Sequence, residues 1–175
     1  MWAIQQRERD ATAYNEGLLA RVEGPIDLAA LRASLEVLTR RHPALRTTFE
    51  ECDGQLWQRV APSSAIELQV ESAASTEQAL AAGRAVLDAP FELEREAWRW
   101  RVIHGPEASY IAFAIHHIVF DMWSFGVLLA ELGAVYGACV ADQPLPLPAV
   151  EQGRGGSSGR AARKSTSRRL RASAT

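Results

Sequence analysis

The chain has 175 residues, of which 47% are hydrophobic and 23% charged, and its formal net charge is −2. This composition suits one domain with a buried core and excludes a disordered or fibrous protein. The longest uninterrupted apolar runs, 111–115 and 125–130, are far shorter than the roughly 18 residues of a membrane span, and the N-terminus does not resemble a secretory signal. With two cysteines far apart in sequence, these features favour a cytoplasmic protein.

The first half of the chain predicts a strand, a helix and a hairpin. Residues 14–22 form the expected strand, and Asp27 caps a helix that continues through Arg41. Leucines recur on one face of that helix, at Leu28, Leu31, Leu35 and Leu38. Strands over 45–50 and 56–60 flank Asp53-Gly54, a dipeptide typical of hairpin turns.

The second half continues the mixed pattern, with expected strands over 66–71, 98–104 and 110–115 and expected helices over 75–87 and 124–141. Alternation in the first of these strands points Ile66, Leu68 and Val70 toward the core. Residues 110–115 are apolar throughout, which predicts a central strand buried on both faces. The expected fold class is therefore α/β, an α+β sandwich with a mixed sheet flanked by helices.

The expected domain covers residues 1–143, and residues 144–175 form a linker and tail. Three prolines, Pro144, Pro146 and Pro148, begin the linker. Residues 151–175 contain seven basic residues, one acidic residue and a single large aliphatic side chain, Leu170. Such a segment cannot bury enough apolar surface to order itself, so we expect a disordered tail. A basic arm for nucleic acid is disfavoured, because no aromatic residue lies among the arginines.

One group of residues carries chemistry: His116, His117 and Asp121 directly follow the apolar strand. Polar groups at the end of a buried strand are costly unless they are paired. The spacing lets a turn bring Asp121 back toward His117, or toward a cation that supports the loop. A histidine there is a candidate general base, although the spacing alone leaves structural and metal-binding interpretations open. Neither His42 nor His104 has the spacing of a third metal ligand, so no metal is expected.

Three segments in order resemble one protein family, the condensation domains of nonribosomal peptide synthetases. His-His-x-x-x-Asp at 116–121, followed by Met-Trp-Ser-Phe-Gly-Val-Leu-Leu, is similar to the core motif of that family. Residues 41–49, Arg-His-Pro-Ala-Leu-Arg-Thr-Thr-Phe, resemble its second motif. Trp2-Ala3-Ile4, with Tyr14-Asn15 downstream, resembles the end of the first motif and the start of the first strand.

The resemblance implies a fold of two chloramphenicol acetyltransferase-like lobes with the active site in a tunnel between them. In such a domain, carrier proteins deliver acyl or aminoacyl thioesters on phosphopantetheine arms, and an amide forms. No bound cofactor is implied. An acyltransferase of the same superfamily with a hydroxyl acceptor is an alternative, as is a non-catalytic remnant that binds carrier proteins. Neither a nucleic acid nor a membrane is an expected partner.

The resemblance also implies residue roles. The expected catalytic set is His117, His116 and Asp121, in which His117 lies beside the attacking amine and His116 is a packed support. Asp121 is expected to be structural and ion-paired with Arg46. Trp123 is expected to line the core or the tunnel, and Ser124 to cap the last helix.

Two departures from the family pattern bear on activity. Met122 replaces the usual glycine after the aspartate, which restricts the backbone at that point. The match ends near Val150, so the chain resembles an N-terminal lobe whose C-terminal lobe is missing, and we expect it to be inactive alone. Arginine outnumbers lysine 18 to 1, as GC-rich coding favours, and a frameshift or truncated gene is the preferred explanation of the tail over a genuine disordered one.

Overall fold

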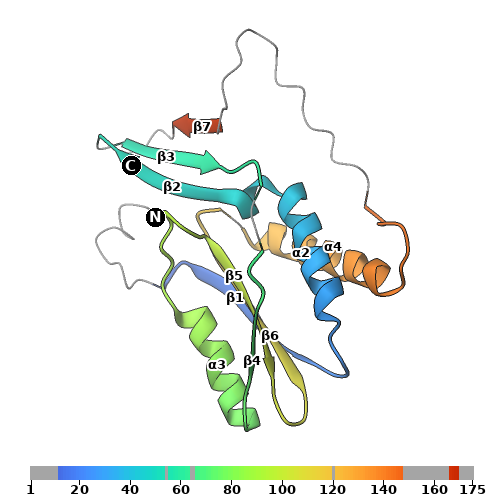
Figure 1. Cartoon of the computed structure of the whole chain (residues 1–175). Helices are drawn as coiled ribbons and strands as arrows, with labels where there is room; N and C mark the ends of the chain where they lie inside the picture. The colour runs from blue at the N-terminus through green and yellow to red at the C-terminus, as the bar shows by residue number, and fades with distance from the viewer. Residues whose placement is uncertain (1–11, 54, 64–65, 120, 148–165, 170–175) are drawn as a thin grey trace.

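The computed structural model describes residues 12–53, 55–63, 66–119, 121–147 and 166–169 (Figure 1). Within these residues the chain forms one four-stranded sheet, one three-stranded sheet and three α-helices. In chain order the elements are β1 (Asn15–Val22), α2 (Leu28–Arg41), η1 (Pro43–Arg46), β2 (Thr47–Cys52), β3 (Gln55–Val60), β4 (Gln69–Ser72), α3 (Thr76–Asp88), β5 (Trp98–His104), β6 (Ser109–His116), α4 (Met122–Val140) and β7 (Thr166–Arg169). The expected α/β fold with a mixed sheet flanked by helices is confirmed.

The larger sheet has the strand order β1-β6-β5-β4. β6 runs antiparallel to both β1 and β5, whereas β4 and β5 are parallel. The last five residues of β6, from Ala112 to His116, have no exposed surface. β6 is therefore the central strand that its uninterrupted apolar sequence predicts.

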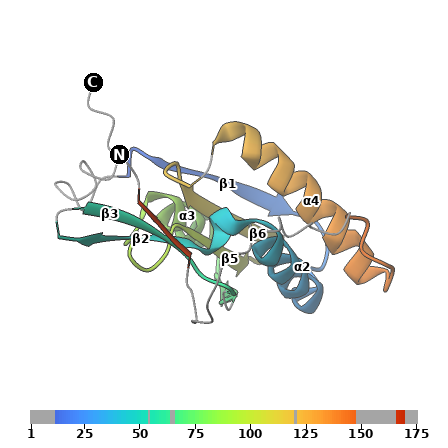
Figure 2. The same cartoon turned by 90° about the horizontal axis from the view of Figure 1, so that it is seen from above.

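Helices cover both faces of this sheet (Figures 1 and 2). α2 and α4 lie side by side on one face, where Leu35, Leu38 and Leu128 pack against Phe113. α3 covers the other face, where Ala79 and Val86 join the cluster that contains Ala112 and Ala114. Side chains thus alternate along β6 between two apolar clusters, and this anchors the strand end that carries the histidines.

The smaller sheet has the order β2-β3-β7. Its hairpin turns at Asp53, which has a φ of 53°. The edge strand β2 is tied to the rest of the fold by the hydrogen bond from Phe49 N to Leu93 O (2.9 Å). β7 pairs with β3 and belongs to the segment expected to be a disordered tail. The other tail residues, 148–165 and 170–175, and the motif residues Trp2-Ala3-Ile4 lie outside the described part of the chain.

Side-chain caps mark the helix starts, and Asp27 is the cap that the sequence predicts for α2. Asp27 accepts a hydrogen bond from Ala30 N (2.9 Å), and Ser75 accepts one from Gln78 N (3.1 Å). The third start differs: Asp121, not Ser124, caps α4 and accepts from Ser124 N (2.8 Å). The expected role of Ser124 as a cap is therefore wrong. Asp121, three residues before Ser124, accepts the hydrogen bond from a backbone N–H of the first turn, so it occupies the cap position.

Two expected strands are shorter than the sequence pattern predicts. Leu45 and Arg46 belong to the 3-10 turn η1, because Pro43 starts that turn directly after α2. The expected strand 66–71 pairs only over Gln69–Ser72. Ile66 and Leu68 are buried as expected, but Val70 is 44% exposed, because β4 is an edge strand with a neighbour on one side only.

Among the described residues, no helix combines the length and the apolarity needed to cross a membrane.

Candidate active site

The candidate site is the segment that leaves the central strand. β6 ends at His116, residues 117–119 form a turn, and α4 begins after Asp121. Backbone hydrogen bonds hold the exit on both sides: His116 N donates to Ala97 O (2.8 Å) and His117 N donates to Tyr14 O (2.9 Å). The two histidines therefore sit at a fixed point between the strands that flank β6.

His116 lies inside the core and has no exposed surface. Its Nδ1 accepts a hydrogen bond from Ile118 N (3.1 Å), and the rings of Tyr14 and Phe91 lie 6.0 and 6.2 Å from its ring. Burial above all, together with the nearby His117, lowers the pKa of His116 to about 4. The neutral imidazole of His116 therefore stabilises the turn through its hydrogen bond with Ile118 N and does not face solvent.

His117 points the other way, and its side chain is 41% exposed. Its Nδ1 atom is nevertheless buried and lies 2.7 Å from Oε1 of Glu16, whose side chain is 20% exposed. The contact is an ion pair by distance, although its direction does not meet hydrogen-bond geometry. Since Nδ1 is covered, the exposed part of the ring is the edge opposite Glu16.

Glu16 is a site residue that sequence reasoning missed. It lies on β1, where it is registered opposite Ile115 of β6. The available indication was a carboxylate directly after Tyr14-Asn15, in a strand otherwise rich in apolar residues. The contact depends on the register of two strands about one hundred residues apart, which the sequence pattern does not specify.

Asp121 and Arg46 do not form the expected ion pair in the described structure. Asp121 is exposed and caps α4, and its hydrogen bonds with Ser124 lower the pKa of its carboxyl group. Arg46 donates from Nε to Thr39 O (2.9 Å) and from its guanidinium to Ala61 O. The prediction is wrong because each group has other partners: the aspartate binds the start of α4, and the arginine binds the backbone carbonyls of Thr39 in α2 and Ala61 after β3.

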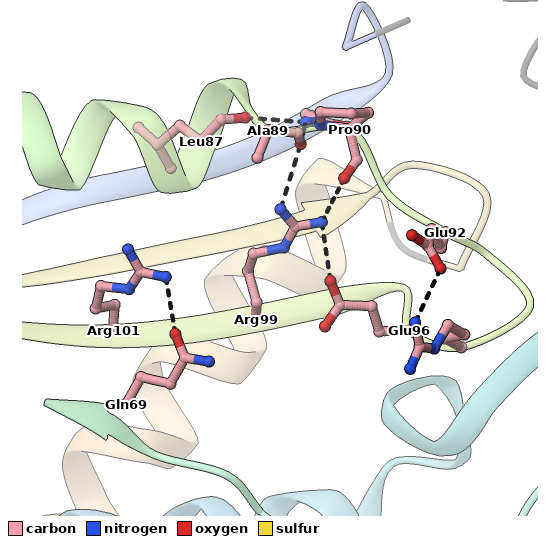
Figure 3. A network of polar contacts seen from close by, with 10 residues as sticks. Gln69, Leu87, Ala89, Pro90, Glu92, Glu96, Arg99 and Arg101 are labelled. Carbon is pink, nitrogen blue, oxygen red and sulfur yellow. Dashed lines mark hydrogen bonds and ion pairs between the residues drawn. The ribbon is translucent and has the colours of Figure 1, made fainter. Parts of the chain in front are cut away.

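A polar network behind His116 holds the wall of the site (Figure 3). Arg99 donates to Ala89 O (3.4 Å) and Pro90 O (2.8 Å), pairs with Glu96 (3.0 Å) and lies over the ring of Phe91 at 3.9 Å. Burial lowers the pKa of Arg99. This network orders the segment after α3, whose Phe91 ring contacts His116.

Asn15 completes this wall from the β1 side. Its Nδ2 donates to Leu87 O (2.9 Å) and to Ala89 O (2.8 Å), two carbonyls at the end of α3. The Tyr14-Asn15 pair is thus structural. The carbonyl of Tyr14 accepts the hydrogen bond from His117 N, and the side chain of Asn15 joins β1 to α3.

A hollow of about 510 Å³ lies beside η1 and the first half of β5, and neither His116 nor His117 lines it. Arginines and tryptophans contribute to its lining, among them Arg46, Trp98, Arg99 and Trp100. Among the described residues, no group of three or more potential ligands is arranged to hold a metal ion. The side chain of Trp123 lies outside the described part, so its expected lining role stays a prediction.

Comparison with known proteins identifies the family. The profile of the condensation-domain family matches residues 1–152. Over 151 residues the chain is 37% identical to the cyclosporin synthetase simA of Tolypocladium inflatum, which covers 85% of this chain and 1% of that protein. It is also 37% identical over 156 residues to the nonribosomal peptide synthetase kk1B of Curvularia clavata, covering 85% of this chain and 1% of the synthetase.

The fold shows the same likeness. The crystal structure of the starter condensation domain of the rhizomide synthetase RzmA superposes with a TM-score of 0.75 at 24% identity, over 84% of this chain and 37% of that chain. The chain belongs to the condensation-domain family. It spans about 1% of the two synthetases named above and little more than a third of the solved domain.

Proposed function

We propose that residues 1–143 form the N-terminal lobe of a condensation domain that joins two carrier-bound thioesters through an amide bond. One observation carries this proposal: the family motif ends a buried strand and presents one half-exposed imidazole, His117, while its neighbour His116 is enclosed. The acceptor is an amine and the donor a thioester, as the homologous peptide synthetases imply.

The geometry supports distinct roles for the motif residues in this proposal. The acceptor nitrogen attacks the thioester carbonyl carbon, the carbon–sulfur bond breaks, and the phosphopantetheine thiol leaves. The amine must lose a proton, and His117 offers an exposed ring edge that can accept it. His116 supports the turn, and Asp121 fixes the start of α4.

The partners of this lobe follow from the same proposal. They are carrier proteins and a C-terminal lobe, because the chain covers 37% of a solved condensation domain and a tunnel needs two walls. Substrates arrive as phosphopantetheine thioesters, so the lobe requires no cofactor of its own. The free cysteines Cys52 and Cys139 suit the reducing cytoplasm.

The test fuses the chain to the C-terminal lobe of a related condensation domain and supplies carrier-bound donor and acceptor. Amide product, measured by mass spectrometry, should appear with this fusion and fall by about 10²- to 10⁴-fold in its His117→Ala variant, the range that general acid–base catalysis contributes. His104→Ala is the matched control, because His104 contacts Ser109 at the far end of β6. An active fusion that keeps full activity without His117 would refute the proposal, and ester formation on a hydroxyl acceptor alone would favour the alternative acyltransferase.

A further inference from the structure

Two buried polar atoms belong to the contact between His117 and Glu16. The Nδ1 atom of His117 and the Oε2 atom of Glu16 are buried, and neither has a hydrogen-bond partner within the described residues. The second carboxylate oxygen, Oε1, lies 2.7 Å from Nδ1. A buried polar group without a partner costs about 1–3 kcal/mol, so the pair is expected to satisfy itself. The χ2 torsion of histidine has a broad minimum, so the imidazole can rotate to direct Nδ1 at the carboxylate.

The backbone holds both partners in place. Tyr14 O accepts the hydrogen bond from His117 N, and Glu16 is two residues further along the same segment. Gly17 follows, and a Cβ added there would lie 2.1 Å from Phe113 O. Only glycine permits β1 to approach β6 so closely at this point. The carboxylate is therefore carried to His117 by a strand whose position is tightly constrained.

The charge arrangement suits a carboxylate–imidazole pair. Glu16 is mostly buried, and its Oε1 atom lies 2.7 Å from Nδ1 of His117. An imidazole whose Nδ1 carries the proton and points at a carboxylate has a free lone pair on Nε2. A carboxylate in this place fixes the tautomer and lies next to the positive charge that the ring acquires on taking up a proton.

We infer that Glu16 is a positioning residue for His117, an inference that rests on the proposed function. The Glu16 carboxylate accepts the Nδ1 proton of His117, holds the ring plane, and leaves Nε2 on the exposed edge to take the proton from the acceptor amine. Glu16 itself does not contact the substrate.

The test reads the tautomer of His117 directly, by ¹⁵N NMR of the 175-residue chain at pH 8 or above, where an ordinary imidazole is neutral. The His117 signals are assigned by their loss in His117→Ala. The unmodified chain should show the Nδ1–H tautomer, and Glu16→Met should shift it toward Nε2–H. Glu23→Met is the matched control, because Glu23 follows the same strand but pairs with Arg21 and is 81% exposed. It should leave the tautomer unchanged.

An Nε2–H tautomer in the unmodified chain would overturn the inference, and this measurement does not depend on whether Glu16→Met folds. An unchanged Nδ1–H tautomer in a folded Glu16→Met chain would also overturn it. Folding of that variant is checked by the signals of His42, His104 and His116.

Activity supplies the second readout. In the fused domain, Glu16→Met should lower kcat at least about tenfold with little change in KM, and by less than His117→Ala does. A tenfold rise in KM with an unchanged kcat would contradict a positioning role. Full activity of His117→Ala would count against the proposed function, whereas the wrong tautomer would count against Glu16 alone.

Discussion

At the scale of single residues, the two adjacent histidines differ because one faces the core and the other faces out. Successive side chains at a strand end point to opposite sides, so His116 is enclosed while His117 is 41% exposed. Burial then removes the charge of the first imidazole, and the second remains available to a substrate.

The lowered pKa of His116 makes folding stability depend on pH. The pKa is about 4 in the folded chain and near 6.5 when unfolded, so the unfolded chain binds the extra proton between these values and stability falls as pH falls. We expect the unfolding free energy, measured by urea titration, to drop by about 2 kcal/mol from pH 7 to pH 5 through this residue. His116→Asn, which retains an acceptor for Ile118 N, should flatten that dependence. An equally steep pH dependence in the variant would show that other groups cause it.

Asp121 stabilises α4 as a cap and not through Arg46. Asp121→Ala should therefore lower the urea midpoint, and Asp121→Asn should restore most of it, because asparagine also caps helices well. In a double-mutant cycle with Arg46→Ala, the two losses should add, since no shared contact joins the residues. Strong coupling would revive the ion pair that the motif resemblance implied.

The site residues divide by how local their contacts are. The sequence was sufficient to place His116, His117 and Asp121 at a strand exit, because an apolar run and an amphipathic helix bracket them. It did not reveal Glu16, nor the partners of Arg46, because those contacts depend on strand register and on the turn after α2.

At the scale of elements, α2 is tied to α4 by a buried charge cluster. Glu131, the one charged residue in the sequence of α4, is 14% exposed and contacts Arg41 Nε at 2.9 Å and His42 Nε2 at 2.6 Å. A hydrogen bond from Asp27 N to Tyr136 OH (3.0 Å) joins the start of α2 to α4 as well. The second family motif therefore contributes to the orientation of the helix that follows the active-site turn.

Glu131→Ala should destabilise the chain by about 2 kcal/mol, because it removes a largely buried carboxylate that serves two partners. Urea unfolding measures the change. Glu36→Ala, at an exposed position of α2, is the control and should change the unfolding free energy by less than about 0.5 kcal/mol. Equal effects of the two substitutions would show that the cluster contributes nothing.

The sequence predicts best the elements whose ends are marked by residues within the element or next to it. Asp27 and Ser75 mark helix starts within the chain's local pattern, and 98–104 matches β5 fully. β4 and η1 were harder, because an edge strand and a post-proline turn are determined by what packs beside them.

At the scale of the whole molecule, the outward face of α4 differs from those of the other helices. α2 and α3 expose charged side chains such as Arg32, Glu36 and Arg84. The exposed residues of the part of α4 with described side chains are all small or apolar: Gly126, Val127, Ala130, Gly133, Ala134, Gly137 and Val140. A continuous uncharged surface of this kind favours association.

The isolated chain should therefore self-associate, as sedimentation velocity would show by a rising average mass with concentration. Ala134→Lys should shift the chain toward the monomer by placing a charge in the middle of that surface. Ala85→Lys, the same substitution on the exposed face of α3, should not. A strictly monomeric chain, or equal effects of both lysines, would refute this interpretation of the α4 face.

The most direct test of the central claim compares amide formation by the 175-residue chain alone with that by the chain fused to a C-terminal lobe, using the same carrier-bound donor and acceptor. Orienting two reactants can supply about 7–11 kcal/mol of the barrier reduction, and one lobe cannot hold both arms. The account predicts no amide above the uncatalysed background from the chain alone, and turnover that depends on His117 from the fusion. Turnover by the isolated chain, or turnover by the fusion without His117, would contradict it.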